Sequence, residues 1–250
     1  MLPQALLARL SLAKHVVALT GAGISAESGV PTFRDAQSGL WARYKAEELA
    51  TPEAFLQNPR LVWNWYAWRR SLTQKAAPNA GHLALVRLQE LVPNLTLITQ
   101  NVDGLHTRAG SRDVLELHGN IETTLCFDEG TRVPAGEYTD DGREPPRCPR
   151  CGGLLRPGVV WFGESLPQAT LERAERAAAT CDALLSIGTS SLVHPAASLP
   201  VSAKANRRGA LLIEVNPSPT PLTPLVDAAL TGRAGDLLPQ LVQQLEAIRG

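Results

Sequence analysis

The sequence predicts an α/β fold: a Rossmann-like, doubly wound parallel sheet into which a smaller helical and zinc-ribbon-like lobe is inserted. Short apolar runs alternate with helical segments, and the runs are continuously apolar, as in strands that are covered on both faces. Right-handed crossovers between such strands give a doubly wound sheet, which binds ligands at the carboxyl ends of its strands. The expected strands are 15–19, 95–99, 114–117, 159–161, 183–187, 211–215 and 228–230.

Helices are expected before and between these strands. Residues 1–13 carry Arg9 within a helical pattern and lack an apolar segment followed by a cleavage site of small residues, so they predict a first helix rather than a signal peptide. The other helices are expected at 59–75, 79–92, 167–180, 195–208 and 236–248.

Two stretches interrupt the alternation. Residues 35–78 lack a convincing strand and contain a helix rich in Trp and Arg, whereas residues 120–157 carry a Cys-x-x-Cys and little apolar periodicity. We expect both to be insertions, one helical and one resembling a zinc module, that together form the smaller lobe. The sheet domain then comprises residues 1–34, 79–119 and 158–250, and the cleft between the lobes is a favoured place for a ligand.

Composition excludes several classes of protein. With 44% hydrophobic and 19% charged residues, the chain is too apolar to be disordered. The 24 Lys and Arg balance the 24 Asp and Glu, so no overall positive field draws the chain to nucleic acid or anionic lipid. No apolar run approaches the roughly 20 residues of a membrane span, and four cysteines are too few for a disulfide scaffold. We expect a cytoplasmic protein that binds neither membranes nor, directly, nucleic acid.

A glycine-rich turn follows the first expected strand. The segment Gly21-Ala-Gly-Ile-Ser-Ala26 has the spacing G-x-G-x-x-A, whose glycines permit a tight turn and a close backbone approach to a pyrophosphate, while the alanine lets helix and strand pack closely. The acidic residue that a dehydrogenase places about 20 positions later, at the end of a second strand, has no counterpart, because Glu47 and Glu48 lie in a helix-like stretch. The pattern therefore favours a dinucleotide site but leaves the dehydrogenase fingerprint incomplete.

Six motifs follow one another along nearly the whole chain. They are 21–34 (Gly-Ala-Gly-Ile-Ser-Ala-Glu-Ser-Gly-Val-Pro-Thr-Phe-Arg), 99–106 (Thr-Gln-Asn-Val-Asp-Gly-Leu-His), 117–119 (Leu-His-Gly), 160–164 (Val-Trp-Phe-Gly-Glu), 188–190 (Gly-Thr-Ser) and 214–216 (Glu-Val-Asn). In these motifs and their order the sequence resembles the sirtuin family of NAD-dependent protein lysine deacylases. The resemblance implies an enzyme, with NAD as co-substrate and acyl-lysine proteins as partners. It implies that the products are nicotinamide, 2′-O-acyl-ADP-ribose and free lysine.

The resemblance implies that the loop after the second expected strand holds the nicotinamide riboside. Asp103 and the backbone near Val102 would bind the nicotinamide amide, and Gln100 and Asn101 would contact the ribose, since an amide side chain can hydrogen-bond hydroxyls from either end. From the residues alone, a loop that is stabilised by Asx turns is the favoured interpretation of 100–103.

The other cofactor contacts that the resemblance implies come from several turns. Phe33 would shield the ribose from water, and Arg34 would donate to phosphate. The remaining expected contacts are Gly21, Ala22, Gly23, Ser25, Gly188, Thr189, Ser190, Glu214, Val215, Asn216 and Ala234.

His118 is the expected general base, with Asn101 as the second catalytic residue. It follows the run 114–117, at the carboxyl end of a strand. A neutral imidazole with a pKa near 6.5 can take a proton from a ribose hydroxyl at physiological pH. Taken alone, such a histidine is more often a hydrogen-bonded structural residue, and the resemblance is what favours the catalytic role.

A Tyr-x-x-Arg pair bears on the acyl group. Tyr66 and Arg69 are three apart on the expected helix 59–75 and so share one face. In one sirtuin class this pair recognises the carboxylate of succinyl- or malonyl-lysine, and Ala50 matches the small residue that gives that class a roomier pocket. The open alternative is that Tyr66 packs, Arg69 is exposed and Arg70 shares the face, in a deacetylase without preference for carboxyl-bearing groups.

The peptide that carries the acyl-lysine is expected along the motif 160–164. Extended backbone there would pair with substrate backbone as an added strand. The expected contacts are Val160, Trp161, Phe162 and Gly163.

A structural zinc site is expected in the smaller lobe. Cys148 and Cys151 form a Cys-x-x-Cys, which sirtuins normally pair with a second one upstream. Here the upstream motif is Cys126-Phe-Asp-Glu129, so zinc would bind three thiolates and a fourth ligand from Glu129, Asp128 or water. A metal-free lobe and a Cys148–Cys151 disulfide are the two alternatives.

Two other functions remain open at this point. Mono-ADP-ribosyl transfer would use the same cleft, with a protein nucleophile in place of the acyl group. A non-catalytic NAD sensor would be expected to lack the His or Asn at the ribose, and this chain retains both.

Overall fold

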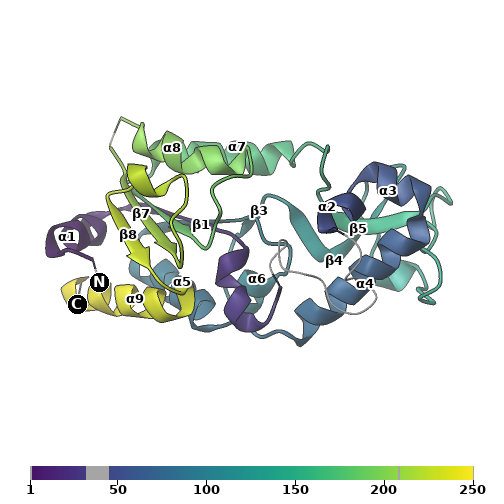
Figure 1. The fold of residues 1–250 in the computed structure, drawn as a ribbon, viewed down its shortest axis with the longest axis horizontal. Coiled ribbons are helices and arrows are strands. Elements are labelled where there is room, and N and C mark those ends of the chain that lie inside the picture. The colour runs from purple at the N-terminus through teal and green to yellow at the C-terminus, as the bar shows by residue number, and fades with distance from the viewer. Residues whose placement is uncertain (1, 32–44, 208, 250) are drawn as a thin grey trace.

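Six parallel strands form the larger of two sheets in the computed structural model, which describes residues 2–31, 45–207 and 209–249 (Figure 1). The order in the sheet is β3-β2-β1-β6-β7-β8, and every neighbouring pair is parallel. This confirms the doubly wound parallel sheet that the sequence predicts. The strands are β1 (His15–Thr20), β2 (Asn94–Thr99), β3 (Leu115–Glu116), β6 (Ala183–Ile187), β7 (Leu211–Asn216) and β8 (Ala228–Thr231).

The strand order reverses at β1. From β1 the chain moves outward through β2 to β3, and it later returns to the other side of β1 and moves outward through β6, β7 and β8. Doubly wound sheets bind ligands where the order reverses, at the carboxyl ends of the strands. That point lies beside the paired strand ends Thr20 and Ile187.

Helices cover both faces of this sheet (Figure 1). One face carries α1 (Gln4–Leu12), α5 (Ala80–Leu91) and α9 (Ala234–Arg249), and the other carries α7 (Gln168–Thr180) and α8 (Leu199–Lys204). Within the described residues, no helix has both the length and the apolar character that crossing a membrane would require.

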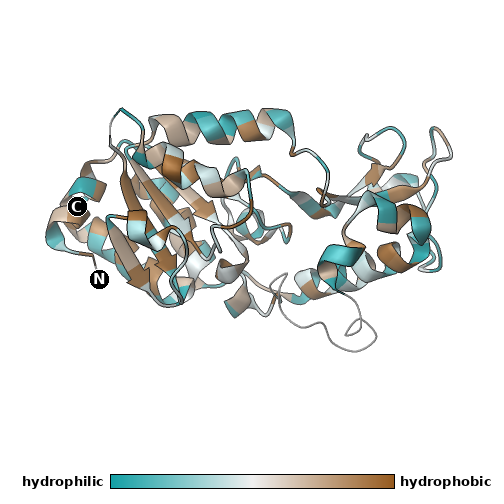
Figure 2. Ribbon diagram, turned by 45° about the horizontal axis from the view of Figure 1, so that its top comes forward, coloured by the Kyte–Doolittle hydropathy of each residue, from teal (hydrophilic) through white to brown (hydrophobic). Residues whose placement is uncertain are grey.

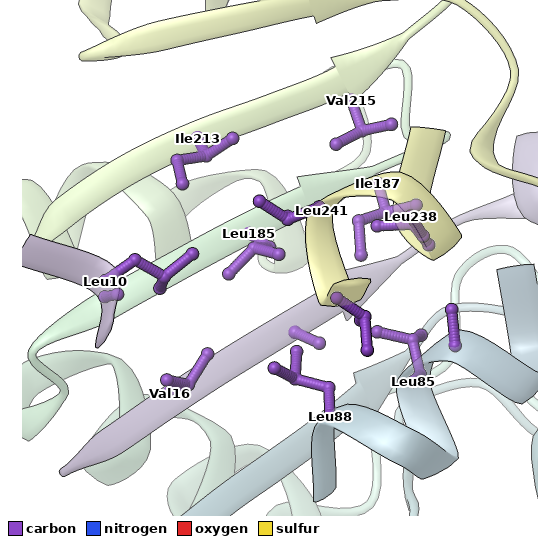
Figure 3. Close-up of a cluster of buried hydrophobic side chains, with 14 of the residues drawn as sticks. Leu10, Val16, Leu85, Leu88, Leu185, Ile187, Ile213, Val215, Leu238 and Leu241 are labelled. Atoms are coloured by element: carbon purple, nitrogen blue, oxygen red, sulfur yellow. The ribbon is translucent and has the colours of Figure 1, made fainter. Parts of the chain in front are cut away.

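The core of the sheet has two halves, one on each face. Successive residues of a strand point to opposite faces, so Val16 packs with α1, α5 and α9, whereas Val17 packs with α7 and α8. Figure 3 shows the first half, where Leu10, Leu88 and Leu241 reach from the helices onto the strands. Figure 2 shows these strands mostly in brown, between helices with teal segments. Burial on both faces explains why the strand sequences are continuously apolar.

A second sheet lies beside the first, on the right of Figure 1. Its two strands, β4 (Gly119–Cys126) and β5 (Leu155–Val159), are antiparallel. Their buried residues pack in one cluster with those of α2 (Ala46–Leu49), α3 (Pro52–Gln57) and α4 (Pro59–Lys75), the helices of the inserted segment. The exact domain boundaries expected from the sequence remain a prediction.

Side-chain caps determine where the helices of this part begin. Thr51 Oγ1 accepts a hydrogen bond from Ala54 N, and Asn58 Oδ1 accepts one from Leu61 N, both at 3.0 Å. A proline follows each cap, at the helical position where its missing N–H costs nothing. Asn79 caps α5, where its Oδ1 accepts from Gly81 N at 2.9 Å, and no proline follows it.

The expected strand at 159–161 was wrong. The strand is Leu155–Val159, and it pairs with β4 outside the parallel sheet. Arg156, Pro157 and Gly158 conceal it, because strands are usually poor in proline and glycine and contain few buried charges. A two-stranded sheet tolerates proline because both of its strands are edges.

Two helices differ from their expected bounds. In place of a helix over 195–208, a 3-10 turn (Ala196–Ser198) leads into the short α8, and the chain then turns at Asn206, whose amide donates to Cys181 O at 3.0 Å. The helix expected at 236–248 begins two residues earlier, at Ala234.

Strands β4 and β5 approach each other closely at Gly119 and Gly158, a contact that we call the crossing. Gly119 has φ +77°, and a Cβ on it would lie 2.2 Å from the carbonyl oxygen of Gly158. Val160 N donates to His118 O at 2.9 Å beside this crossing. Both the positive φ and the close approach therefore require glycine at position 119.

We predict that Gly119→Ala destabilises the fold more than Gly142→Ala does. Gly142 has a similar φ of +72°, but a Cβ there would meet nothing within 4 Å. The strain of the positive φ, about 1–2 kcal/mol, is common to both variants, and the clash with Gly158 should add about 2 kcal/mol or more. At ~2–4 °C per kcal/mol, thermal unfolding should show Gly119→Ala melting about 4–8 °C below Gly142→Ala. Equal melting temperatures would show that the crossing relaxes freely.

Candidate active site

Two backbone turns touch at the point where the strand order reverses. Gly21 N donates to Ile187 O at 3.0 Å, and Gly23 N donates to Gly188 O at 2.9 Å. A Cβ on Gly21 would lie 2.8 Å from Gly188 O, and one on Gly23 would lie 2.7 Å from Gly188 Cα. The glycines that the sequence analysis assigns to a pyrophosphate approach are thus also required by the neighbouring turn.

The chain after β1 forms two 3-10 turns, η1 (Ala22–Ile24) and η2 (Ala26–Ser28), rather than the regular helix implied by the glycine pattern. Glu27 ties these turns to α9, because its carboxylate accepts from Gly235 N at 2.9 Å. Ala234, an expected cofactor contact, begins α9 and is buried, so its side chain packs in the core. Expected residues Phe33 and Arg34 lie outside the described residues.

Three polar side chains form a buried cluster at the ends of β1 and β2. Ser25 Oγ donates to Asp103 Oδ2 at 2.7 Å, and Asn101 Nδ2 donates to Ser25 Oγ and to Gly21 O, both at 3.1 Å. Asp103 Oδ1 accepts from Leu105 N at 2.9 Å. The Asx-type contact that the sequence left open is therefore present, and the same carboxylate also belongs to the cluster. Burial strengthens such hydrogen bonds and fixes their orientation.

His118 lies beside this cluster, with its ring half-buried. Its Nδ1 is 2.9 Å from Gln100 O. A carbonyl oxygen can only accept, so Nδ1 carries the hydrogen and Nε2 has the lone pair of a base. Desolvation lowers the pKa of His118 below its usual value, although the hydrogen bond to Gln100 opposes this shift.

A second histidine at this end of the sheet has different properties. His106 is fully buried, and its Nε2 lies 2.9 Å from Thr20 Oγ1. Desolvation, together with the neighbouring His82, lowers the pKa of His106 to about 3. His106 therefore stays neutral at physiological pH, and His118 is the histidine with partial access to solvent.

The cofactor contacts expected after β6 and β7 lie in two turns at the ends of these strands. Thr189 Oγ1 lies 3.1 Å from Ser191 Oγ, and Asn216 Nδ2 donates to Thr189 O at 3.3 Å, so the two turns are connected. The Glu214 carboxylate is buried, accepts from the Thr220 and Thr223 hydroxyls and faces inward. Val215 packs in the core, and Ser190 lies in the turn with Gly188.

The Tyr66 and Arg69 side chains share one face of α4, next to Ala50. The Arg69 guanidinium carbon lies 4.9 Å from the centre of the Trp65 ring and 6.0 Å from that of Tyr66. Arg70 turns elsewhere and donates to Ile121 O at 2.9 Å. Arg69 and Arg70 thus contact different groups, and the choice between them as the residue that recognises the acyl group stays a prediction.

Burial changes the acid–base properties of the pair. Desolvation raises the pKa of Tyr66 to about 12, so the phenol keeps its proton. Desolvation also lowers the pKa of Arg69, whose side chain is partly exposed. A carboxylate at this face would offset that cost.

The segment 160–164 is not extended as the sequence analysis expects. Only Val160 continues from β5; Phe162 and Gly163 form a turn closed by Glu164 N donating to Trp161 O at 3.0 Å. The amides of Val160 and Phe162 already donate to His118 O and Ala50 O, both at 2.9 Å. Gly163, with φ +87°, makes this turn possible.

Arg156 and Glu164 are site-flanking residues to which the sequence analysis gave no role. They form a bidentate ion pair across this turn, with Nη1–Oε1 at 2.5 Å and Nη2–Oε2 at 2.9 Å. The signal in the sequence is an arginine and a glutamate eight residues apart, at the two ends of an apolar run, and it is too weak to interpret without the fold.

Four possible metal ligands meet between β4 and β5. The ligand atoms of Cys126, Glu129, Cys148 and Cys151 all lie within 4.8 Å of one another, and Cys126 Sγ is 3.4 Å from Cys151 Sγ. Tetrahedral zinc with bonds of about 2.3 Å needs ligands roughly 3.8 Å apart, so the cluster fits the ion. All four cysteines of the chain are free thiols, so the disulfide alternative is wrong.

The chemistry of these donors also fits a cation. The pKa of Cys151 is raised to about 12: the Gly153 amide lowers it, but hydrogen bonding to Cys126, desolvation and Cys148 together raise it by more. Neighbouring thiols resist ionisation together, and a bound cation removes that repulsion. Glu129, whose carboxylate also accepts from Arg150 Nε at 3.2 Å, supplies the fourth donor.

Comparison with known proteins gives a consistent result. The family model described as the Sir2 family matches residues 21–195. A curated relative from Aquifex aeolicus, named NAD-dependent protein deacylase, is 54% identical over 92% of this chain and 95% of its own. One of the same name from Methylococcus capsulatus is 50% identical over 98% and 97%. A solved Sir2 homologue in complex with NAD superposes with a TM-score of 0.93 at 47% identity, over 100% of this chain and 96% of that one.

We predict that the protein, purified without added metal, carries about one zinc per chain, as a closed four-ligand site does. Glu129→Gln should lose most of this zinc, because it replaces a charged donor of the cluster, and Asp128→Asn should retain it. Elemental analysis of both variants beside the wild type measures the difference. If only Asp128→Asn loses zinc, the fourth ligand is Asp128 rather than Glu129. A zinc-free wild type would mean that packing alone holds this lobe together.

Proposed function

The chain belongs to the Sir2 family, and on that basis we propose how its residues carry out NAD-dependent deacylation of protein lysines. It is an NAD-dependent protein deacylase, and its substrates are proteins. The proposal concerns the residues that act, the acyl groups that are removed and the compartment. Three clustered free thiols and a low cysteine count support a reducing cytoplasm, and the balanced charge supports acyl-lysine proteins rather than nucleic acid as partners.

The observation that carries the proposal is the orientation of His118 beside the polar cluster of Ser25, Asn101 and Asp103. In this orientation Nε2 is the basic nitrogen of His118, at the edge of the sheet where ligands bind. We assign His118 the role of general base, which accepts a proton from a ribose hydroxyl at Nε2 and later returns it.

The buried cluster would hold the nicotinamide end of NAD. Asp103 offers carboxylate oxygens to an amide N–H, and Asn101 and Gln100 offer groups to the ribose hydroxyls. The touching turns at Gly21 and Gly188 present backbone without side chains, which suits a close approach of phosphate. When bound, NAD supplies the ADP-ribose that accepts the acyl group. The chain's own contribution is to position the reactants, an effect worth some 7–11 kcal/mol in favourable cases.

We propose that the acyl pocket accepts succinyl and malonyl groups as well as acetyl. Tyr66 and Arg69 share a face of α4, Tyr66 packs in the same cluster as Ala50, and the Arg70 guanidinium is held by Ile121 O. The Tyr66 phenol keeps its proton and can donate it, and the Arg69 fork matches a carboxylate.

We predict that His118→Ala lowers kcat by about 10²–10⁴-fold, the usual contribution of a general base, while NAD still binds. In the wild type, kcat/KM should rise with pH as His118 loses its proton. Because desolvation lowers the pKa of His118, the midpoint of this rise should lie below the usual value of about 6.5. Steady-state pH profiles and NAD titration by calorimetry measure both effects. A midpoint above that value, or an active His118→Ala variant, would remove His118 from the role.

We also predict that Arg69→Met abolishes the preference for carboxyl-bearing acyl groups. The variant keeps a side chain of similar length but loses the charge, so kcat/KM for a succinyl-lysine peptide should fall about 10²-fold or more, as when a charged hydrogen-bonded pair is broken. The value for the acetyl peptide should be retained or should rise. Arg70→Met, which alters the neighbouring arginine that donates to Ile121 O, is the matched control and should keep the wild-type ratio. An unchanged ratio in Arg69→Met would refute the carboxylate clamp.

A further inference from the structure

The Arg156–Glu164 ion pair is buried at its arginine, whereas the Glu164 side chain is 26% exposed. Arg156 is 8% exposed, its guanidinium carbon is 3.4 Å from the centre of the Trp161 ring, and its Nη2 also donates to Val159 O at 2.9 Å. Its Nε is buried without a hydrogen-bond partner. Replacing a buried ion pair by apolar residues is often neutral or stabilising. Stability alone therefore does not explain why this arginine is here.

The ion pair fixes the backbone and the ring of Trp161 together. Glu164 Oε2 accepts from Trp161 N at 2.7 Å, while Arg156 stacks on the indole. The backbone of Trp161 is therefore held by the carboxylate and its ring by the guanidinium. The indole Nε1 then donates to the Tyr66 hydroxyl at 3.0 Å.

This last hydrogen bond determines which way the Tyr66 proton can point. A phenol has one O–H to donate and two lone pairs that accept. Because the indole N–H occupies one lone pair, the O–H of Tyr66 must point away from Trp161. The hydroxyl is thereby kept as a donor for a second acceptor.

We propose that Trp161 is a specificity-determining residue for carboxyl-bearing acyl groups, acting through the Tyr66 hydroxyl, and that Arg156 and Glu164 are its positioning residues. The inference rests on the proposed succinyl and malonyl activity and extends it from the helix α4 to the turn 160–164. The same turn is bound to His118 through Val160 and to Ala50 through Phe162. The ion pair thus helps to fix the position of the general base relative to the acyl pocket.

The test compares kcat and KM on succinyl-lysine and acetyl-lysine peptides of one sequence, at saturating NAD. Trp161→Phe keeps a ring for Arg156 but removes the N–H. It should lower the succinyl-to-acetyl ratio of kcat/KM about three- to tenfold, the effect of one lost hydrogen bond. Trp63→Phe is the matched control, because Trp63 Nε1 donates to Asp140 and not to Tyr66. This control should keep the wild-type ratio.

Glu164→Gln tests the positioning role. It keeps the volume of Glu164 but removes the charge, and it should lower the same ratio. Because we propose that Glu164 acts through the Trp161 indole, the double variant Trp161→Phe with Glu164→Gln should have nearly the ratio of Trp161→Phe alone. Independent structural damage would instead multiply the two effects. If Glu164→Gln does not fold, the comparison of the succinyl-to-acetyl ratio between Trp161→Phe and Trp63→Phe still tests the role of Trp161.

Each outcome has a defined meaning. A wild type that removes succinyl groups, with Arg69→Met losing this activity and Trp161→Phe unchanged, would overturn this inference and leave the proposed function intact. A wild type without succinyl activity would overturn this inference and the proposed succinyl and malonyl preference, and would leave NAD-dependent deacylation and the role of His118 untouched. An equal loss of both activities in Trp161→Phe would assign the indole to general substrate binding and overturn its role in specificity.

Discussion

The contact between the turns after β1 and β6 is the constraint on which the site depends. These turns can touch only because Gly21, Gly23 and Gly188 carry no side chains. The contact fixes Gly21 O, to which the Asn101 amide donates, and Asn101 in turn donates to Ser25, which donates to Asp103. A backbone requirement of two parallel strands therefore sets the orientation of the whole polar cluster.

The neighbouring strand extends the same constraint to the general base. Gln100 N donates to Thr20 O at 3.0 Å, as β2 continues beside β1, and Gln100 O receives the hydrogen bond of His118. The degree of burial then distinguishes His118 from His106. His106 is so deeply buried that it stays neutral, whereas desolvation lowers the pKa of the half-buried His118 against the opposing hydrogen bond to Gln100. The two rings differ in surroundings rather than in chemistry.

The sequence predicted most of the sheet, because strands covered on both faces have an unmistakable apolar pattern, as at 183–187. It failed at β5, where Arg156 is neutralised by a partner eight residues later and the pattern of a strand is lost. Residue motifs located the cluster at 100–103, but they could not show that 160–164 turns rather than extends. That depends on acceptors at His118 and Ala50, which are distant in sequence. Long-range hydrogen bonds leave no local signal.

The bond between Glu27 and Gly235 has a consequence for how the protein is made. It joins the turn after the first strand to the start of the last helix, and β1 likewise needs β6 as its neighbour. Glu27 and Gly235 are 208 residues apart in the chain, so the ribosome synthesises them at very different times. The nucleotide site formed by the glycine turns therefore cannot be completed while the chain is still being elongated. Until α9 has left the ribosome, the glycine turn after β1 lacks its contact with Gly235. Contacts between residues so far apart in sequence slow folding. Chains whose synthesis stops before α9 should therefore lack a complete nucleotide site, even if their small lobe has already folded.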